Sequence, residues 1–149
     1  MALRERCKLA VHVTSGEGPY LDLVASRHGA KLKDTVPGVV KPVKFKTMKL
    51  GNGFYIQDDG ERRFVGVSMK EFAALLTRLS PDYPVQDETG LAGRYDFTLP
   101  WFGYRHYPAS EFSSPLDRMP LKGAGLVLKR GKGPVNIIDI EHIERPDAN

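Results

Sequence analysis

A single capped helix pattern, set among strand patterns, is the strongest constraint on how this chain folds. Ser68 and Glu71 have the spacing of a capping box, in which each side chain accepts a hydrogen bond from the backbone N–H of the other residue. Apolar residues then recur at helical spacing as far as Leu79, and Pro81 ends the pattern. The sequence therefore predicts one amphipathic helix over residues 69–79.

Most other periodic stretches alternate between apolar and polar residues, as half-buried strands do. Residues 8–14 and 20–26 flank a Gly- and Pro-containing segment at 15–19, which predicts a hairpin. Residues 126–129 and 135–143 flank a similar segment at 130–134 and predict a second hairpin. Further strands are expected at 54–57, 63–67, 85–87 and 95–101.

These patterns together predict an α+β fold: a mainly antiparallel sheet of about seven short strands with one well-formed helix at 69–79. A weak helical pattern near residues 116–122 is interrupted by Pro120, so any second helix there is expected to be short. The segment from Asp34 to Gly53 is irregular and long for a loop, and we expect part of it to be mobile or functional.

Composition sets the outer limits of the interpretation. The chain has 149 residues and a formal net charge of +4, which suits one domain and is too weak alone to argue for nucleic-acid binding. Cys7 is the only cysteine, so an internal disulfide is excluded. No apolar run approaches the length of a membrane span, and the N-terminal residues lack the apolar region of a signal peptide.

Three blocks of the chain resemble a family of uncharacterised proteins that is abundant in soil bacteria, notably acidobacteria, and is known only as a domain of unknown function. The blocks are residues 3–33, residues 67–101 and residues 125–149. The most specific element is the pattern Asp87-x-Thr89-Gly90-Leu91-x-Gly93-x-Tyr95-Asp96-Phe97. A more distant resemblance links the helix-then-strand unit to the short N-terminal domains of secretins and TonB-dependent receptors.

The resemblance implies a cellular location, but it implies no reaction. Members of the family look exported, and some are fused to sensor metallopeptidases of the β-lactam-sensor type, so the resemblance implies an extracytoplasmic location. It also implies that residues 1–149 form a single domain from the C-terminal part of a longer protein. No catalytic residues, cofactor or metal ligands are implied.

Aromatic residues after residue 100 are the strongest candidates for a binding surface. Trp101, Phe102, Tyr104, Arg105 and Tyr107 lie close together in the sequence, and aromatic side chains with arginine are common anchors of recognition surfaces. The alternative is a lid that packs on the sheet. Our first hypothesis is a non-catalytic binding or interaction domain at the bacterial cell envelope, with an unknown protein or small molecule as its partner.

Two other functions remain as alternatives. A hydrolase-type enzyme would use Asp87 and Asp96 with a histidine for acid–base catalysis, although the same carboxylates are expected to cap a turn and to pair with a nearby group. Nucleic-acid binding would use the run from Lys41 to Lys49, with Phe45 stacking on a base, although a solvated loop explains the same lysines.

Metal sites are not expected. The histidines, His12, His28, His106 and His142, form no short metal-binding motif with one another. The acidic group Asp58, Asp59 and Glu61 lacks the ligand spacing of a calcium loop, and its sequence is typical of a hairpin turn.

Overall fold

The computed structural model describes residues 8–103 and 105–144, and its chain falls into two compact units. One unit combines Met1–Pro19 with Lys132–Asn149, and the other is Tyr20–Gly131. The strands are β1 (Ala10–Ala25), β2 (Lys33–Asp34), β3 (Thr47–Leu50), β4 (Gly53–Asp58), β5 (Gly60–Ser68), β6 (Val85–Asp87), β7 (Arg94–Trp101) and β8 (Leu126–His142). The helix α2 spans Met69–Leu79, and one-turn 3₁₀ helices span Ala109–Glu111 (η1), Pro115–Arg118 (η2) and Lys122–Ala124 (η3).

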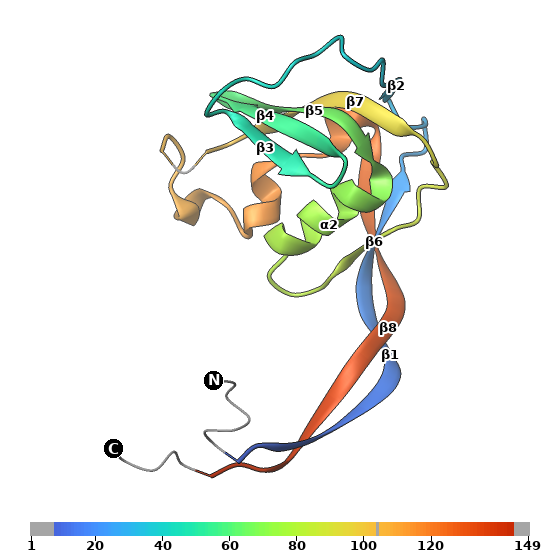
Figure 1. The fold of residues 1–149 in the computed structure, drawn as a ribbon, viewed down its shortest axis with the longest axis vertical. Helices are drawn as coiled ribbons and strands as arrows, with labels where there is room; N and C mark the ends of the chain where they lie inside the picture. Colours follow the sequence, from blue (N-terminus) through green and yellow to red (C-terminus); the bar gives the residue numbers. More distant parts are fainter. Residues whose placement is uncertain (1–7, 104, 145–149) are drawn as a thin grey trace. The chain divides into compact units, whose positions relative to one another are not determined.

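The α+β prediction is confirmed, with mainly antiparallel sheets and one α-helix at 69–79. A five-stranded sheet has the order β2-β7-β5-β4-β3, and a three-stranded sheet has the order β6-β1-β8 (Figure 1). The β1–β6 pair is parallel. The pattern near 116–122 forms only the single turns η2 and η3, on either side of Pro120.

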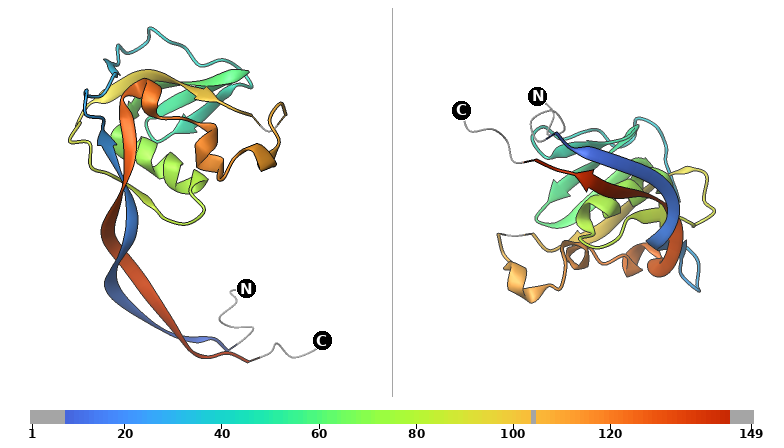
Figure 2. Two further views of the ribbon diagram at one scale, coloured as in Figure 1. Left: turned by 180° about the vertical axis from the view of Figure 1, so that it is seen from behind. Right: turned by 90° about the horizontal axis from the view of Figure 1, so that it is seen from below.

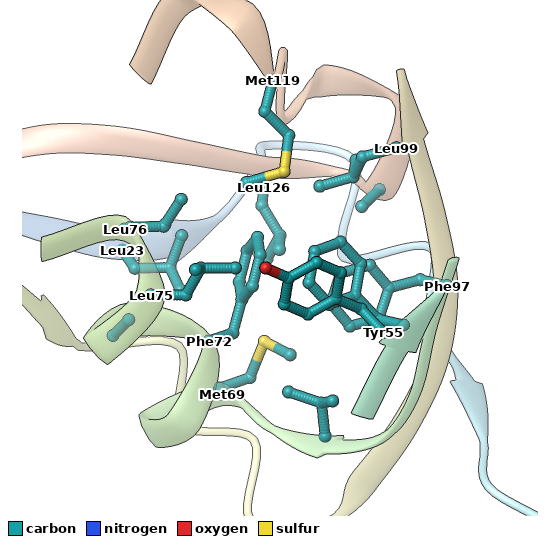
Figure 3. Close-up of a cluster of buried hydrophobic side chains, with 14 of the residues drawn as sticks. Leu23, Tyr55, Met69, Phe72, Leu75, Leu76, Phe97, Leu99, Met119 and Leu126 are labelled. Atoms are coloured by element: carbon teal, nitrogen blue, oxygen red, sulfur yellow. The ribbon is translucent and has the colours of Figure 1, made fainter. Parts of the chain in front are cut away.

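Tyr20–Gly131 has its core between helix α2 and the five-stranded sheet (Figure 3). Phe64 and Phe97 stack on adjacent strands with ring centroids 4.8 Å apart, and Phe72 of the helix meets both rings edge-on at 5.1 Å. Leu76 is fully buried, and Leu23, Val85 and Leu126 of the three-stranded sheet join the same cluster. The alternating pattern of β7 is confirmed, because Phe97, Leu99 and Trp101 are all buried.

Both predicted hairpins are wrong, because β1 and β8 each continue through the segment that was expected to turn. The two strands are neighbours in one sheet. A Cβ atom added at Gly16 would lie 2.9 Å from the Ile137 side chain, and one added at Gly18 would lie 2.7 Å from Val135. The order of these contacts means that the strands run antiparallel. The glycines therefore leave room for large side chains on the partner strand, and they do not turn the chain.

The carboxylate of Glu71 connects three separate segments of the unit Tyr20–Gly131. Its Oε1 accepts hydrogen bonds from the Asn52 backbone N–H (2.9 Å) and from Arg94 Nη2 (3.1 Å). Its Oε2 accepts from the Ser68 backbone N–H (3.1 Å) and from Arg94 Nη1 (3.1 Å). The predicted capping box is thus present, and the same side chain also holds the β3–β4 turn and the start of β7.

These contacts shift the ionisation of Glu71. Partial burial alone would raise the pKa of the carboxyl group, but the hydrogen bonds from Arg94, Asn52 and Ser68 outweigh burial and lower the pKa from an ordinary value of 4.5 to about 2.

Leu76 offers a direct test of the core. We expect Leu76→Ala to lower the free energy of unfolding by about 2–5 kcal/mol, because the lost side chain leaves a cavity between the helix and the sheet. Lys70→Ala on the exposed face of the same helix should change it by no more than about 0.5 kcal/mol. Urea denaturation of the three proteins measures both values, and equal midpoints would contradict this packing.

Glu71 predicts how stability depends on pH. Since the folded-state pKa is below the unfolded value, the contribution of Glu71 is present above pH 4.5 and is lost as the pH falls through about 2. We expect Glu71→Gln to cost about 1–2 kcal/mol at neutral pH, a value reduced for the solvent screening of the half-exposed Arg94. Urea unfolding at successive pH values should show the gap between wild type and variant closing in acid. Glu88→Gln, at an exposed site, should show no such gap.

Candidate functional site

A cavity of about 360 Å³ lies between the β4–β5 turn and the segment that follows β7. The register of the sheet creates it, because β5 pairs antiparallel with β7 and sets Gly60 opposite Trp101. The walls include Asp58, Asp59, Arg62, Trp101, Arg105, His106 and Tyr107. We call this cavity the Trp101 pocket.

Arg62 and Trp101 form the rigid wall of the Trp101 pocket. The guanidinium carbon of Arg62 lies 3.5 Å from the centroid of the Trp101 ring and 5.1 Å from that of Tyr55. Arg62 Nη2 also donates a hydrogen bond to Gln57 Oε1 at 3.2 Å. Arg62 and Trp101 are only 7% and 5% exposed, so this cation–π contact is largely shielded from water and correspondingly strong. Trp101 thus supports the pocket from within the fold.

Acidic and basic residues both line the Trp101 pocket. Asp58 and Asp59 come from the β4–β5 turn, and Arg105 and His106 come from the segment after β7. Asp58 Oδ1 accepts a hydrogen bond from Lys46 Nζ at 2.6 Å, and this bond raises the pKa of Lys46. A ligand with both cationic and anionic or hydrogen-bonding groups would find complementary partners on opposite sides.

The segment after β7 is held by a buried arginine. Arg118 Nη1 donates to the carbonyl oxygens of Phe102 (2.7 Å) and Tyr107 (3.0 Å), and Arg118 is 1% exposed. The rings of Phe102, Tyr107 and Phe112 pack on one another with centroids 5.2 to 6.3 Å apart. The guanidinium of Arg118 lies 4.6 Å from the centroid of Phe112. Backbone and aromatic contacts therefore fix the position of Tyr107 at the pocket edge.

The aromatic residues expected to form a binding surface divide into three groups. Trp101, Arg105 and Tyr107 all line the Trp101 pocket. Phe102 packs against Phe112 in the neighbouring aromatic cluster. Tyr104 lies outside the described residues.

Sequence reasoning missed the opposite side of the pocket. The sequence pattern indicates only a turn at Asp58 and Asp59, and it contains no local signal at Arg62. The signal that would have found them is the pairing of β5 with β7, because it brings the β4–β5 turn beside Trp101.

Asp96, one of the carboxylates of the hydrolase hypothesis, stabilises a β-bulge. The register of β5 against β7 shifts between Phe64 and Val67, and Gly66 there has a φ of 64°. Asp96 Oδ1 accepts a hydrogen bond from the Gly66 backbone N–H at 2.9 Å and from Thr35 Oγ1 at 2.6 Å. The carboxylate satisfies a backbone donor that the bulge removes from regular pairing.

Asp87, the second of these carboxylates, caps a turn, as the sequence suggested. Its Oδ1 accepts hydrogen bonds from the backbone N–H of Thr89 at 2.9 Å and from the Thr89 hydroxyl at 2.6 Å. Asp87 belongs to β6 and the three-stranded sheet, whereas Asp96 belongs to β7 and the five-stranded sheet. Hydrogen bonds hold Asp87 at a turn and Asp96 at the β-bulge of β5.

The histidines occupy separate places in the chain. His106 lines the Trp101 pocket, and His142 Nε2 lies 2.9 Å from Glu144 Oε1. Within residues 8–103 and 105–144, no three His, Cys, Asp or Glu side chains are grouped so that they could hold a metal ion. In the same residues, no helix is long and apolar enough to cross a membrane.

Comparison with known proteins identifies the family. Residues 1–143 match the family described as Protein of unknown function (DUF3738). No curated protein and no solved structure matches the chain. Because the match covers nearly all of the sequence, the chain belongs to this uncharacterised family.

Proposed function

We propose that this protein is a non-catalytic binding domain of the bacterial cell envelope, and that it holds a polar segment of a partner protein in the Trp101 pocket. The observation that carries the proposal is the combination, in one cavity of about 360 Å³, of an aromatic wall with charged groups of both signs. Ligand pockets typically have this volume and a few convergent polar groups.

The charges favour a peptide over an apolar ligand. Asp59 and Arg105 both line the pocket and are both exposed, and they come from the two different segments that form it. A peptide segment with one basic and one acidic side chain would place the basic side chain near Asp59 and the acidic side chain near Arg105. Tyr107, which is 39% exposed and also lines the pocket, offers apolar contact to the same segment.

Rigidity of the wall supports binding. The Arg62–Trp101 stack and the Arg118 hydrogen bonds hold both sides of the pocket before any ligand arrives. A preformed site loses less conformational entropy on binding, which favours affinity.

The extracytoplasmic location is part of the same proposal. Its support is the resemblance of residues 3–33, 67–101 and 125–149 to a family of soil bacteria whose members look exported and are sometimes fused to sensor metallopeptidases. A binding domain fused to such a sensor would bring its partner protein close to the sensor.

Tyr107 and Tyr83 form a matched pair for testing the pocket, because they are 39% and 38% exposed. A photo-cross-linking amino acid placed at position 107 should form an adduct with a partner in an envelope extract, and mass spectrometry would identify that partner. The same amino acid at position 83 should not. Identical adducts at both positions, or none at 107, would contradict the proposal.

Binding of the purified partner then measures the contribution of each side chain. Tyr107→Ala and Arg105→Ala should each weaken the affinity by about five- to thirty-fold, as expected for anchors worth 1–2 kcal/mol. Tyr83→Ala and Arg27→Ala, at exposed positions away from the pocket walls, should leave affinity unchanged. Thermal unfolding of each variant shows whether the fold is intact. Trp101 is a poor test site because its removal would disturb the buried stack with Arg62.

A further inference from the structure

We infer that the loop of residues 35–46, between β2 and β3, docks the protein on an anionic lipid bilayer. We call this segment the Phe45 loop; it is the teal trace at the top of Figure 1, and Figure 2 shows it from two other sides. The inference is independent of the Trp101 pocket and its partner.

Apolar side chains of the Phe45 loop are unusually exposed. Phe45 is 94% exposed, and Val39, Val36 and Val43 are 70%, 60% and 45% exposed. Clusters of exposed apolar residues on soluble proteins commonly mark a surface that meets another apolar phase.

Positive charge accompanies these apolar groups. Lys41, Lys44 and Lys46 lie within the loop and are exposed, and Lys49 follows on β3. Lys44 Nζ lies 5.0 Å from the centroid of the Phe45 ring. The acidic groups beside the lysines are Asp34, which precedes the loop, and Asp58 and Asp59 of the β4–β5 turn, both of which act on Lys46. Residues 35–46 contain no acidic side chain, so Lys41 and Lys44 keep the loop positively charged, and an anionic headgroup layer attracts such a loop.

The backbone of Phe45 has an unfavourable conformation. Its φ is 66°, a left-handed conformation that is rare for a residue with a bulky side chain. The turn that imposes it is closed by Thr47, whose hydroxyl accepts from the Val43 N–H (2.7 Å) and donates to the Val43 carbonyl oxygen (2.9 Å). The fold thus maintains both an unfavourable conformation and an exposed ring, which partitioning of Phe45 into a bilayer interface would compensate.

The valines decide between lipid and nucleic acid as the occupant. A single strand of nucleic acid would use the ring for stacking and the lysines for phosphates, and Val36 and Val39 would gain nothing. A bilayer interface accepts all of these groups, because aliphatic side chains enter the acyl boundary while the ammonium groups stay at the headgroups. The surface chemistry therefore fits a negatively charged membrane.

Vesicle co-sedimentation tests the inference with the full chain. Binding to vesicles of phosphatidylcholine with phosphatidylglycerol should exceed binding to phosphatidylcholine alone and should fall as salt rises. Phe45→Asn removes the ring and keeps a residue that tolerates positive φ, and it should lower the partition coefficient by about tenfold or more. The double variant Lys41→Glu with Lys44→Glu should have an effect of at least the same size.

A matched control variant distinguishes binding through the Phe45 loop from a general effect of the protein's net charge. Lys122→Glu with Lys129→Glu makes the same change in net charge at exposed lysines elsewhere, and it should retain most of the binding. The inference is overturned if the wild-type protein does not bind anionic vesicles, or if both double variants lose binding equally. Binding of single-stranded DNA without binding of vesicles would also overturn it, in favour of nucleic acid.

Discussion

The Glu71 carboxylate is the interaction on which the arrangement of the second unit, Tyr20–Gly131, most depends. Its two oxygens accept four hydrogen bonds, which is the full capacity of a carboxylate. The donors come from the β3–β4 turn, the start of the helix and Arg94 at the start of β7. One side chain thus fixes the helix relative to three strands, and the apolar face of the helix can then cover Phe64 and Phe97.

Local chemistry explains why the sequence predicted this part of the fold well. The capping box of Ser68 and Glu71 and the alternation along β7 depend on residues near one another in the chain. Their patterns can therefore be recognised without knowing which distant segment they pack against. The predicted hairpins failed for the opposite reason. Gly16 and Gly18 look like turn residues, and only the long side chains of the distant strand β8 show that they are spacers.

The candidate site was predictable on one side only. Aromatic residues next to Arg105 formed a recognisable cluster, and the structure brings three of the five chosen residues to one pocket. Asp58 and Arg62 required knowledge of which strands pair, because the β4–β5 and β5–β7 pairings together bring them to the same pocket as Trp101. Side chains that complete a site across a sheet are invisible to reasoning along a single segment.

The pairing of β1 with β8 also has a consequence for the order of folding. The contacts of Gly16 with Ile137 and of Gly18 with Val135 join residues that are separated by the whole of Tyr20–Gly131. Closing so large a loop is entropically costly while the intervening chain is unfolded, and it becomes inexpensive once that chain has become compact. During synthesis, moreover, the β8 residues are made long after those of β1. We therefore expect the first half of β1, up to Pro19, to pair with β8 only after Tyr20–Gly131 has folded, and until then this half of the strand lacks β8 as its neighbour.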